Sequence, residues 1–487
     1  MAKRVAVIDI GSNSVRMVIY EKTSRFAFHI LYETKSKVRI SESAYNNDSY
    51  LQKIPMERAF DALSEFTTII SSFKVRKTLC VATSALRDAP NKQEFILKVR
   101  HKLKLNIKVI SGEKEAYFGA IACANLLPLQ TNALSIDIGG GSTEFSLINN
   151  NDVTNSISLK LGTVRLKELF FDNNELDKAI EYIDTQLESI THLNISTLIG
   201  IGGTFRTISS AIMSAKNYPL KQLHSFEYLV DEFQNYIEKI LKADKTELKN
   251  LYIEKNRFDL IKPGALILSR VLNKLSITNI ITSGTGVREG VYLADLLRNS
   301  KHKFPHNYNV SIKTLLDRGT ENTNFSNQVN QISQKIFNLT HTYLHLDKSY
   351  LKELSIASKL SVIGSNISFY TQNKTTYNLI KSSLEYGFSH KQIMLIATIN
   401  RYSKNKFPSD EHLLKYAQLL PTKEILNTLC HILSLSIALL SHRPRNIDFD
   451  LEFKNGDLKV ISKSKLYLSQ ESVEKLKKIE NLSISFH

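Results

Sequence analysis

The sequence predicts an α/β core made of two related halves, then an all-helical region, then a small α+β piece at the C-terminal end. Three observations lead to this expectation. Fourteen of the 18 glycines lie before residue 299, where strand and helix patterns alternate with glycine turns. Two short segments of that portion are near copies of each other. From residue 311 one helical pattern follows another with few glycines, until a β-hairpin pattern begins at Asp448.

The two similar segments, residues 7–16 and 135–144, each read as an apolar strand, an Asp-Ile-Gly turn and the start of a second strand. Seven residues after the shared Asp, the first copy has Arg16 and the second has Glu144. Two matching hairpins at one cleft would offer glycine-lined turns, two Asp, one cation and one extra carboxylate. This set is typical of a site that holds phosphates with a divalent metal. Two ordinary hairpins with Asp-Gly turns are the less favoured interpretation, because the motif is duplicated.

The residue types within the two turns fit the same chemistry. Asp9 and Asp137 end apolar strands, so we expect their carboxylates to emerge at the cleft, where such hard oxygen ligands suit Mg²⁺. The hydroxyls of Ser14, Ser142 and Thr143 are candidate donors to phosphate oxygens.

The remaining elements follow from periodicity and turn residues. Between the hairpins we expect helices at 56–73, 91–103 and 113–127 and strands at 77–83 and 107–110. After the second hairpin we expect a helix at 176–187, a strand at 197–201, helices to 273, a strand at 279–282 and a helix ending at 297. The glycine turns 200–204 and 283–290 follow the last two strands. We therefore expect a first domain at 1–127 and a second at 128–298.

The C-terminal portion is organised differently. The third domain is expected at 299–445 and to be helical. Its first residues, 299–309, include Pro305 and are predicted to form a linker. The last domain, 446–487, is expected to contain strands at 448–453 and 458–461, a helix at 471–479 and a strand at 482–486.

The bulk composition indicates an anionic partner. The net charge is +17, and residues 299–487 contribute +10 of it, with 25 Lys and Arg against 15 Asp and Glu. No basic block resembles a nucleic-acid tail, and basic and aromatic residues interleave weakly. A long polyanion or a polyphosphorylated nucleotide therefore fits at least as well as DNA or RNA, and we expect no specific nucleic acid. A generally basic surface is the alternative.

We expect a cytoplasmic protein without a membrane span. The three Cys are far apart in apolar settings and read as reduced thiols. The chain enters a strand soon after Met1, without a signal-peptide pattern. The apolar stretch 425–440 contains several polar residues and reads as a buried helix.

Six motifs, in this order, resemble a known family. They are residues 9–16, 82–87, 110–116, 137–144, 161–165 and 283–290. The hairpins and glycine turns resemble the sugar kinase/actin/Hsp70 superfamily. Within it, the six motifs together resemble the exopolyphosphatase / guanosine pentaphosphate phosphohydrolase (Ppx/GppA) family. The resemblance implies two ribonuclease-H-like (actin-like) domains on either side of a cleft.

The resemblance also implies roles for individual residues. Glu115 would be the catalytic general base acting on water, and Glu144 a second essential carboxylate. Asp9, Asp137 and Glu144 would be the metal ligands for Mg²⁺. Arg87 would grip the reacting phosphoryl group. Candidate phosphate-binding residues are Gly11, Ser12, Asn13, Ser14, Arg16, Arg87, Gly139, Gly140, Gly141, Ser142, Thr143 and Arg165.

For three residues of these motifs a purely structural role is the alternative. Taken alone, Glu115 would be a helix carboxylate favoured by the dipole. For Arg165 and Arg288, a structural salt bridge is about as plausible as phosphate binding.

Longer members of this family carry a helical, HD-like domain, and residues 311–440 resemble it in position. Where a metal-binding site would read His-Asp, this chain has Ser361 and Val362, and residues 367–377 contain no His. We therefore expect a degenerate HD-like domain that extends a substrate channel or forms a homodimer. His341 and His345 are expected to be ordinary helix residues.

The leading hypothesis is a Mg²⁺-dependent phosphohydrolase that releases terminal phosphate from inorganic polyphosphate, converts pppGpp to ppGpp, or does both. A small-molecule kinase of the same superfamily is one alternative. A sensor that binds ppGpp or polyphosphate without turnover, or an actin-like scaffold, is another.

Overall fold

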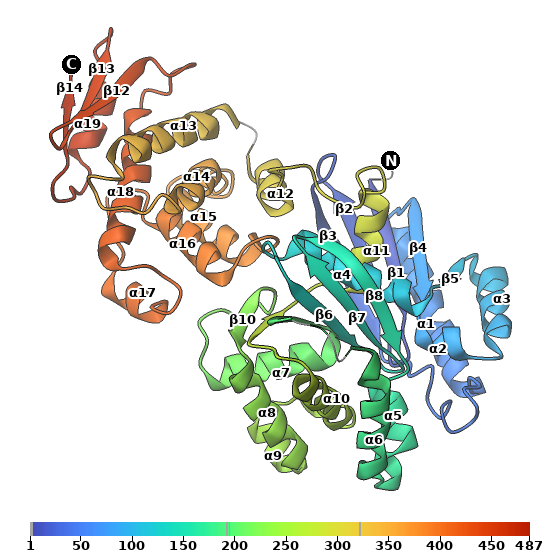
Figure 1. The fold of residues 1–487 in the computed structure, drawn as a ribbon. Coiled ribbons are helices and arrows are strands. Elements are labelled where there is room, and N and C mark those ends of the chain that lie inside the picture. The colour runs from blue at the N-terminus through green and yellow to red at the C-terminus, as the bar shows by residue number, and fades with distance from the viewer. Residues whose placement is uncertain (1–2, 191–192, 194, 321–322) are drawn as a thin grey trace. The chain divides into compact units, whose positions relative to one another are not determined.

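The computed structural model describes residues 3–190, 193, 195–320 and 323–487, and the chain divides into two compact units, residues 1–308 and 309–487 (Figure 1). The first unit contains two mixed β-sheets with helices around them, and the second is mostly helical.

The first sheet of unit 1 has the strand order β3-β2-β1-β4-β5. Its strands are β1 (Arg4–Ile10), β2 (Val15–Lys22), β3 (Phe28–Ser36), β4 (Lys77–Ala82) and β5 (Ile107–Val109). β1 pairs antiparallel with β2 and parallel with β4. Its helices are α1 (Lys53–Ser72), α2 (Ser84–Asp88), α3 (Lys92–Leu103) and α4 (Gly112–Leu126). Side chains of α1 and α3, among them Phe66 and Phe95, are buried with those of β1 in one core.

The second sheet repeats this pattern, with the order β10-β11-β9-β6-β7-β8. Its strands are β6 (Ala133–Ile138), β7 (Thr143–Asn149), β8 (Asp152–Leu159), β9 (Thr197–Ile201), β10 (Phe226–Leu229) and β11 (Asn279–Thr282). β6 pairs antiparallel with β7 and parallel with β9, as β1 does with β2 and β4. Asp137 faces Glu144 across its hairpin, as Asp9 faces Arg16. The expected α/β core with two related halves is confirmed.

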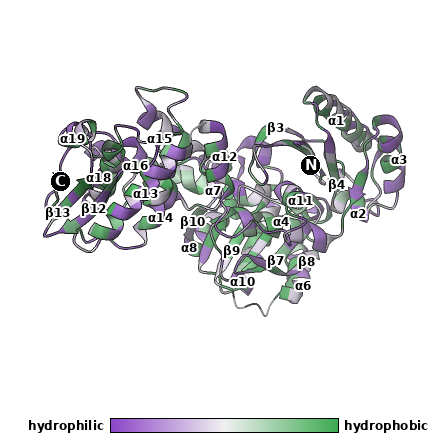
Figure 2. Cartoon of the chain, turned by 90° about the horizontal axis from the view of Figure 1, so that it is seen from above, coloured by the Kyte–Doolittle hydropathy of each residue, from purple (hydrophilic) through white to green (hydrophobic). Residues whose placement is uncertain are grey.

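Seven helices follow or interrupt the second sheet in the part of the chain that is described. They are α5 (Thr163–Leu169), α6 (Leu176–Gln186), α7 (Gly202–Ala215), α8 (Val230–Lys242), α9 (Lys245–Asn250), α10 (Ile261–Lys274) and α11 (Val287–Leu296). In Figure 2 the strand β9 is largely hydrophobic, whereas hydrophilic residues cover much of the outer helix α3.

Two helices pack against the sheet of the other half. Cys123 and Ala124 of α4 are buried with Ile148 and Ile201 of the second sheet, although α4 follows the strands of the first. α11, at the end of the second half, contacts β1 and α4. Where α11 crosses α4, a Cβ on Gly290 would lie 1.8 Å from the carbonyl oxygen of Phe118, so only glycine fits. The two halves are therefore interlocked.

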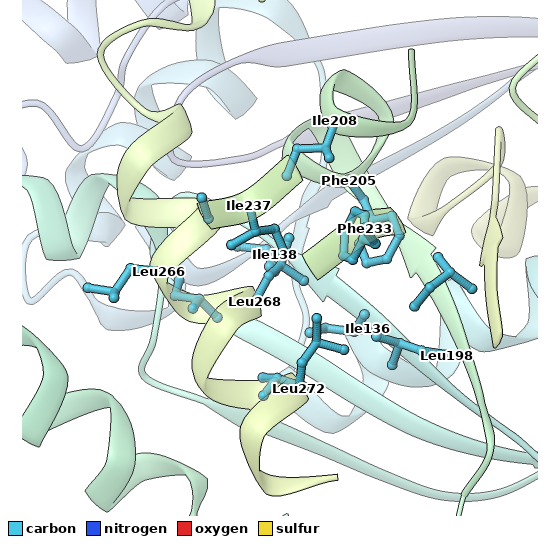
Figure 3. Packing of buried hydrophobic residues seen from close by; sticks show 14 of the residues in the cluster. Ile136, Ile138, Leu198, Phe205, Ile208, Phe233, Ile237, Leu266, Leu268 and Leu272 are labelled. Atoms are coloured by element: carbon cyan, nitrogen blue, oxygen red, sulfur yellow. The ribbon is translucent and has the colours of Figure 1, made fainter. Parts of the chain in front are cut away.

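A large core of unit 1 lies between the second sheet and helices α7, α8 and α10 (Figure 3). The rings of Phe205 and Phe233 stack there, with centroids 4.7 Å apart, and both side chains are fully buried.

We expect Phe233→Ala to lower the free energy of unfolding of unit 1 by about 3–5 kcal/mol, because it removes buried surface and leaves a cavity. Chemical denaturation would measure the change. The control is Leu229→Ala, four residues earlier, where the side chain is 62% exposed and the expected change is within about 0.5 kcal/mol. Equal effects of the two substitutions would contradict this account of the core.

Unit 2 begins with helices and ends with a small sheet. The helices are α12 (Val310–Gly319), α13 (Thr323–Thr340), α14 (Tyr350–Leu360), α15 (Gln372–Ser383), α16 (His390–Arg401), α17 (Asp410–Lys415) and α18 (Lys423–Leu439). They are followed by β12 (Phe449–Lys454), β13 (Asp457–Ser462), α19 (Tyr467–Glu474) and β14 (Ser483–Phe486), with the sheet order β12-β13-β14. In the described part of the chain, no helix has the length and apolar character that crossing a bilayer requires.

Several local predictions need correction. The last helix spans Tyr467–Glu474 instead of the predicted 471–479, and residues 475–482 lie in no helix or strand. His341 and His345 lie in the turn after α13 and not on a helix. The strands β3, β8 and β10 and the short helices α2 and α5 were not predicted, since brief or partly exposed elements leave little periodicity. Of the predicted linker, residues 299–309, all but Asn309 belong to unit 1, where the His302 carbonyl accepts a hydrogen bond from Asn125.

Candidate active site

A cavity of about 150 Å³ lies in unit 1, lined by the turns of both duplicated hairpins. The first turn contributes Gly11, Ser12, Asn13 and Ser14, and the second contributes Gly139, Gly140 and Ser142. The third and fourth glycine turns also line it, through Gly202, Gly203 and Gly286. The structure therefore brings all four glycine turns together around one space.

The two hairpin turns have the same backbone hydrogen bond and lie very close to each other. The Gly11 N–H donates to the Ser14 carbonyl over 3.2 Å, and the Gly139 N–H donates to the Ser142 carbonyl over 2.9 Å. A Cβ on Gly140 would lie 2.8 Å from that of Ser12. The turns can approach this closely only with glycine at that position.

Glu115 lies at the N-terminal end of α4, which positions its carboxylate beside the cavity. The Ser111 hydroxyl caps the helix by accepting a hydrogen bond from the Lys114 N–H. Glu115 is 8% exposed, and its Oε2 accepts a hydrogen bond from Arg87 Nη1 over 2.9 Å. Burial and the neighbouring Glu144 carboxylate raise the pKa of Glu115 well above its ordinary value, although Arg87 opposes them.

Glu144 is the second buried carboxylate of the site. Its Oε1 accepts a hydrogen bond from Ser158 Oγ over 2.7 Å and lies 4.0 Å from Arg87 Nη2. Burial raises the pKa of Glu144 to about 7, and the hydroxyls of Ser142 and Ser158 limit the rise. Ser158 fits here only because residue 112 is glycine, since a Cβ on Gly112 would lie 2.3 Å from that of Ser158.

The two aspartates of the hairpins line the same cavity. Burial raises the pKa of Asp137 to about 6, and Arg206 opposes this shift. The pKa of Asp9 is also raised by burial, with Arg288 and Arg16 opposing. Carboxyl groups held this way gain from a bound cation.

Four arginines line the cavity, and they come from separate parts of the chain: Arg16, Arg206, Arg257 and Arg288. Arg288 pairs with Glu33 over 2.5 Å, and Arg206 donates to the carbonyls of Ser283 and Thr285. Among the described residues, no hydrogen-bond or ion-pair partner contacts the Arg16 side chain, whose backbone pairs within the first sheet. Burial lowers the pKa of Arg16, and the positive charges of Arg288 and Arg206 act in the same direction. An anion in the cavity would relieve this repulsion.

Four predicted phosphate-binding residues do not line the cavity: Arg87, Gly141, Thr143 and Arg165. Arg87 is adjacent to it, because its guanidinium contacts Glu115 and, over 3.3 Å, Ser142 Oγ. The Thr143 hydroxyl donates to the Leu161 carbonyl over 2.5 Å.

The Arg165 side chain makes structural contacts that join the two halves. Arg165 pairs with Asp88 over 2.6 Å, donates to the Gly141 carbonyl over 2.9 Å and stacks on Tyr45.

Residues that sequence reasoning did not select also contribute to the site. Arg206 lies on the first turn of α7, directly after the third glycine turn, and this position was a usable signal. Arg257 and Ser158 lie in no motif, and only the fold places them at the site.

Comparison with known proteins gives two family matches that together cover most of the chain. Residues 18–299 match the Ppx/GppA phosphatase family, and residues 309–478 match domain III of Ppx/GppA phosphatases. The chain is 26% identical, over 443 residues, to a guanosine-5'-triphosphate,3'-diphosphate pyrophosphatase of Photobacterium profundum, covering 88% of this chain and 86% of that protein.

A second relative matches more closely over a shorter length. The chain is 34% identical over 298 residues, or 57% of its length, to a bifunctional 3-dehydroquinate synthase/phosphatase of Fusobacterium nucleatum. It spans only 44% of the length of that relative.

Two solved structures have a similar fold over about three fifths of this chain. One is the Aquifex aeolicus member of the Ppx/GppA family, with 28% identity and a TM-score of 0.54, covering 62% of this chain and 99% of that one. The other is an exopolyphosphatase from Cytophaga hutchinsonii, with 25% identity and a TM-score of 0.57, covering 62% of this chain and 100% of that one. Since the first family match alone extends over more than half of the chain, this protein belongs to the Ppx/GppA phosphatase family.

Proposed function

We propose that this protein is a Mg²⁺-dependent phosphohydrolase that releases the terminal phosphate of inorganic polyphosphate, converts pppGpp to ppGpp, or does both. The observation that carries the proposal is the pair of buried carboxylates, Glu115 and Glu144, held on either side of the Arg87 guanidinium at a glycine-lined cavity. The names of the Photobacterium and Cytophaga relatives agree with these two substrates.

Each part of the site has a task in phosphoanhydride hydrolysis. Glu115, with its raised pKa, is the general base that accepts a proton from the attacking water. Arg87 lies within reach of both Glu115 and Ser142, so it binds the oxygens of the reacting phosphoryl group beside the base. The backbone of the glycine turns binds the following phosphates, and Arg16 supplies positive charge to them.

The donor set fits Mg²⁺ in a substrate complex. Asp9, Asp137 and Glu144 line the cavity, but no group of three His, Cys, Asp or Glu side chains in the described residues converges tightly enough to hold a metal alone. Mg²⁺ usually takes one or two protein carboxylates and completes its shell with water and substrate phosphate. When bound, the ion would supply positive charge to the phosphate oxygens.

The test is phosphate release by the purified chain, offered long polyphosphate and pppGpp in parallel, first with EDTA and then with excess Mg²⁺. We expect release from at least one substrate, only with Mg²⁺. Binding of both without release would replace the proposal with a sensor. Phosphate transfer from ATP to a sugar would favour a kinase, and nucleotide-dependent filaments a scaffold. We also propose that the protein is a homodimer, which light scattering on the same sample would test. If unit 2 is a degenerate HD-like domain, as we propose, the protein should show no phosphodiesterase activity.

Ser158→Ala is expected to raise the pKa of Glu144, because the substitution removes a hydrogen bond to its charged form. Glu144 is ionised above its pKa of about 7, so Mg²⁺ binding weakens as the pH falls through that value. The Mg²⁺ concentration for half-maximal activity should therefore rise about tenfold at pH 6.5, and the difference should shrink at high pH.

The matched control is Ser156→Ala, on the same strand, whose hydroxyl bonds to Ser146 and not to Glu144. Two results would show that Ser158 does not position Glu144. In the first, the Mg²⁺ concentration for half-maximal activity shifts equally in both variants. In the second, Ser158→Ala does not shift it at any pH.

A further inference from the structure

The segment between α14 and α15 of unit 2 exposes three large apolar side chains within four residues. Ile367 and Phe369 are each 68% exposed, and Tyr370 is 87% exposed, the highest value among the large apolar residues described. The two rings are nearly perpendicular, with centroids 5.6 Å apart. Aromatic groups this exposed are unusual on a surface unless they meet a partner.

The fold brings lysines from a second segment to these rings. Lys404 Nζ donates to the Tyr370 carbonyl over 2.9 Å, and Asn373 Nδ2 donates to the Arg401 carbonyl over 2.6 Å. Lys404 and Lys406 are exposed, as is Lys374 on the first turn of α15. We call the set Ile367, Phe369, Tyr370, Lys374, Lys404 and Lys406 the aromatic–lysine patch. Its two segments lie about 30 residues apart in the sequence.

The charge around this patch selects an anionic partner. Residues 354–409 contain seven Lys and Arg and a single acidic residue, Glu385. A second copy of the chain docked symmetrically here would place these lysines against their own counterparts, which is unfavourable. An anionic partner would gain from the same charges.

The mixture of side chains narrows the class of anion. A simple phosphate chain has no group for Phe369 and Tyr370 to contact. A bilayer would have to accept the polar side chains between the apolar ones, including Asn366, Ser368 and Thr371. A single-stranded nucleic acid offers both flat bases, which stack on aromatic rings, and phosphates, which lysines bind.

We propose that the aromatic–lysine patch binds single-stranded nucleic acid without sequence specificity, with bases on Phe369 and Tyr370 and backbone phosphates on Lys374, Lys404 and Lys406. The binding site lies entirely in unit 2 and does not depend on phosphate hydrolysis in unit 1.

The test is fluorescence anisotropy of a labelled oligouridylate of 12 nucleotides with the full chain, at several salt concentrations. We expect saturable binding that weakens with salt, with a slope of log K against log salt of about −2, as three phosphate contacts require. A mixed-sequence oligonucleotide should bind with about the same affinity, and duplex DNA more weakly.

Two variants separate the two kinds of contact. Phe369→Ala with Tyr370→Ala should weaken binding about tenfold or more, with the salt slope unchanged, since stacking is lost. Lys404→Gln with Lys406→Gln should reduce the slope by about 1.4. The matched controls are Tyr467→Ala and Lys463→Gln, exposed residues elsewhere in unit 2, which should leave binding unchanged.

Three results would overturn the proposal: no binding of the oligonucleotide at low salt, equal loss in the control variants, or full loss in Arg16→Ala, which would place the binding in the cavity of unit 1. If anionic vesicles bind and the oligonucleotide does not, the partner of the patch is a membrane surface instead. If the protein is a dimer that dissociates when Phe369→Ala and Tyr370→Ala are combined, the patch serves self-association instead. Phosphate release should be unchanged in the patch variants, so this proposal and the proposed hydrolase fail independently.

Discussion

Replacement of Glu115 by Gln is expected to lower the rate of phosphate release by about 10²-fold or more. The amide keeps the size of the side chain and can still contact Arg87, but it cannot accept a proton from water. Binding of the substrate should change little, because the cavity and its arginines remain. The measurement is kcat and KM for polyphosphate or pppGpp with saturating Mg²⁺.

The control for Glu115→Gln lies on the same helical turn. Glu113 is exposed, and the same change there removes a carboxylate without touching the buried pair. Glu113→Gln should keep kcat within about twofold of the original protein, since exposed substitutions away from the site have small effects. A Glu115→Gln variant that retains full kcat would exclude Glu115 as the general base.

Arg87→Ala is expected to reduce kcat by about 10³-fold, at the lower end of what a phosphoryl-binding arginine contributes. The substitution removes the proposed contact to the reacting phosphoryl group. It also removes the cation beside Glu115, so the pKa of that carboxyl should rise further. The acidic limb of the pH–rate profile should therefore move to higher pH, which a purely structural role would not produce.

Arg87→Lys serves as the comparison for this substitution. Lysine restores a positive charge but not the paired N–H donors that reach Glu115 and Ser142 together. We expect the pH profile to return toward its original position while most of the loss in kcat remains. Full recovery of kcat with lysine would mean that charge alone suffices at this position.

The duplicated hairpins made the centre of the fold predictable. The pairing of Asp9 with Arg16 and of Asp137 with Glu144 follows from the shared spacing, because the same turn fixes the register in both copies. The glycines of the four turns were recognisable because a close backbone approach leaves few other choices. The lining residues contributed by the two hairpin turns could be named on this basis.

The sequence could not reveal contacts that depend on how distant segments pack. Ser158 reaches Glu144 only because β8 lies beside β7, and a strand as exposed as β8 has little periodicity. Arg257 has no motif around it. Thr143 looked like a hydroxyl donor to phosphate, but alternation along β7 turns it toward the Leu161 carbonyl. The structural contacts of Arg165 likewise could not be predicted, because they depend on Asp88 and Tyr45, which lie far away in the sequence.

The exchange of helices between the halves has a mechanical consequence. Glu115 lies on α4, which is packed on the second sheet, whereas Arg87 lies near the end of α2, directly after β4 of the first sheet. We expect a scissor-like opening of the halves to turn about the close backbone contact between Gly290 of α11 and Phe118 of α4. Such a rotation would draw the Arg87 guanidinium away from the Glu115 carboxylate. Glu115, the proposed base, and Arg87 would then be paired only in the closed form, so that closing the cleft would also assemble the proposed catalytic pair.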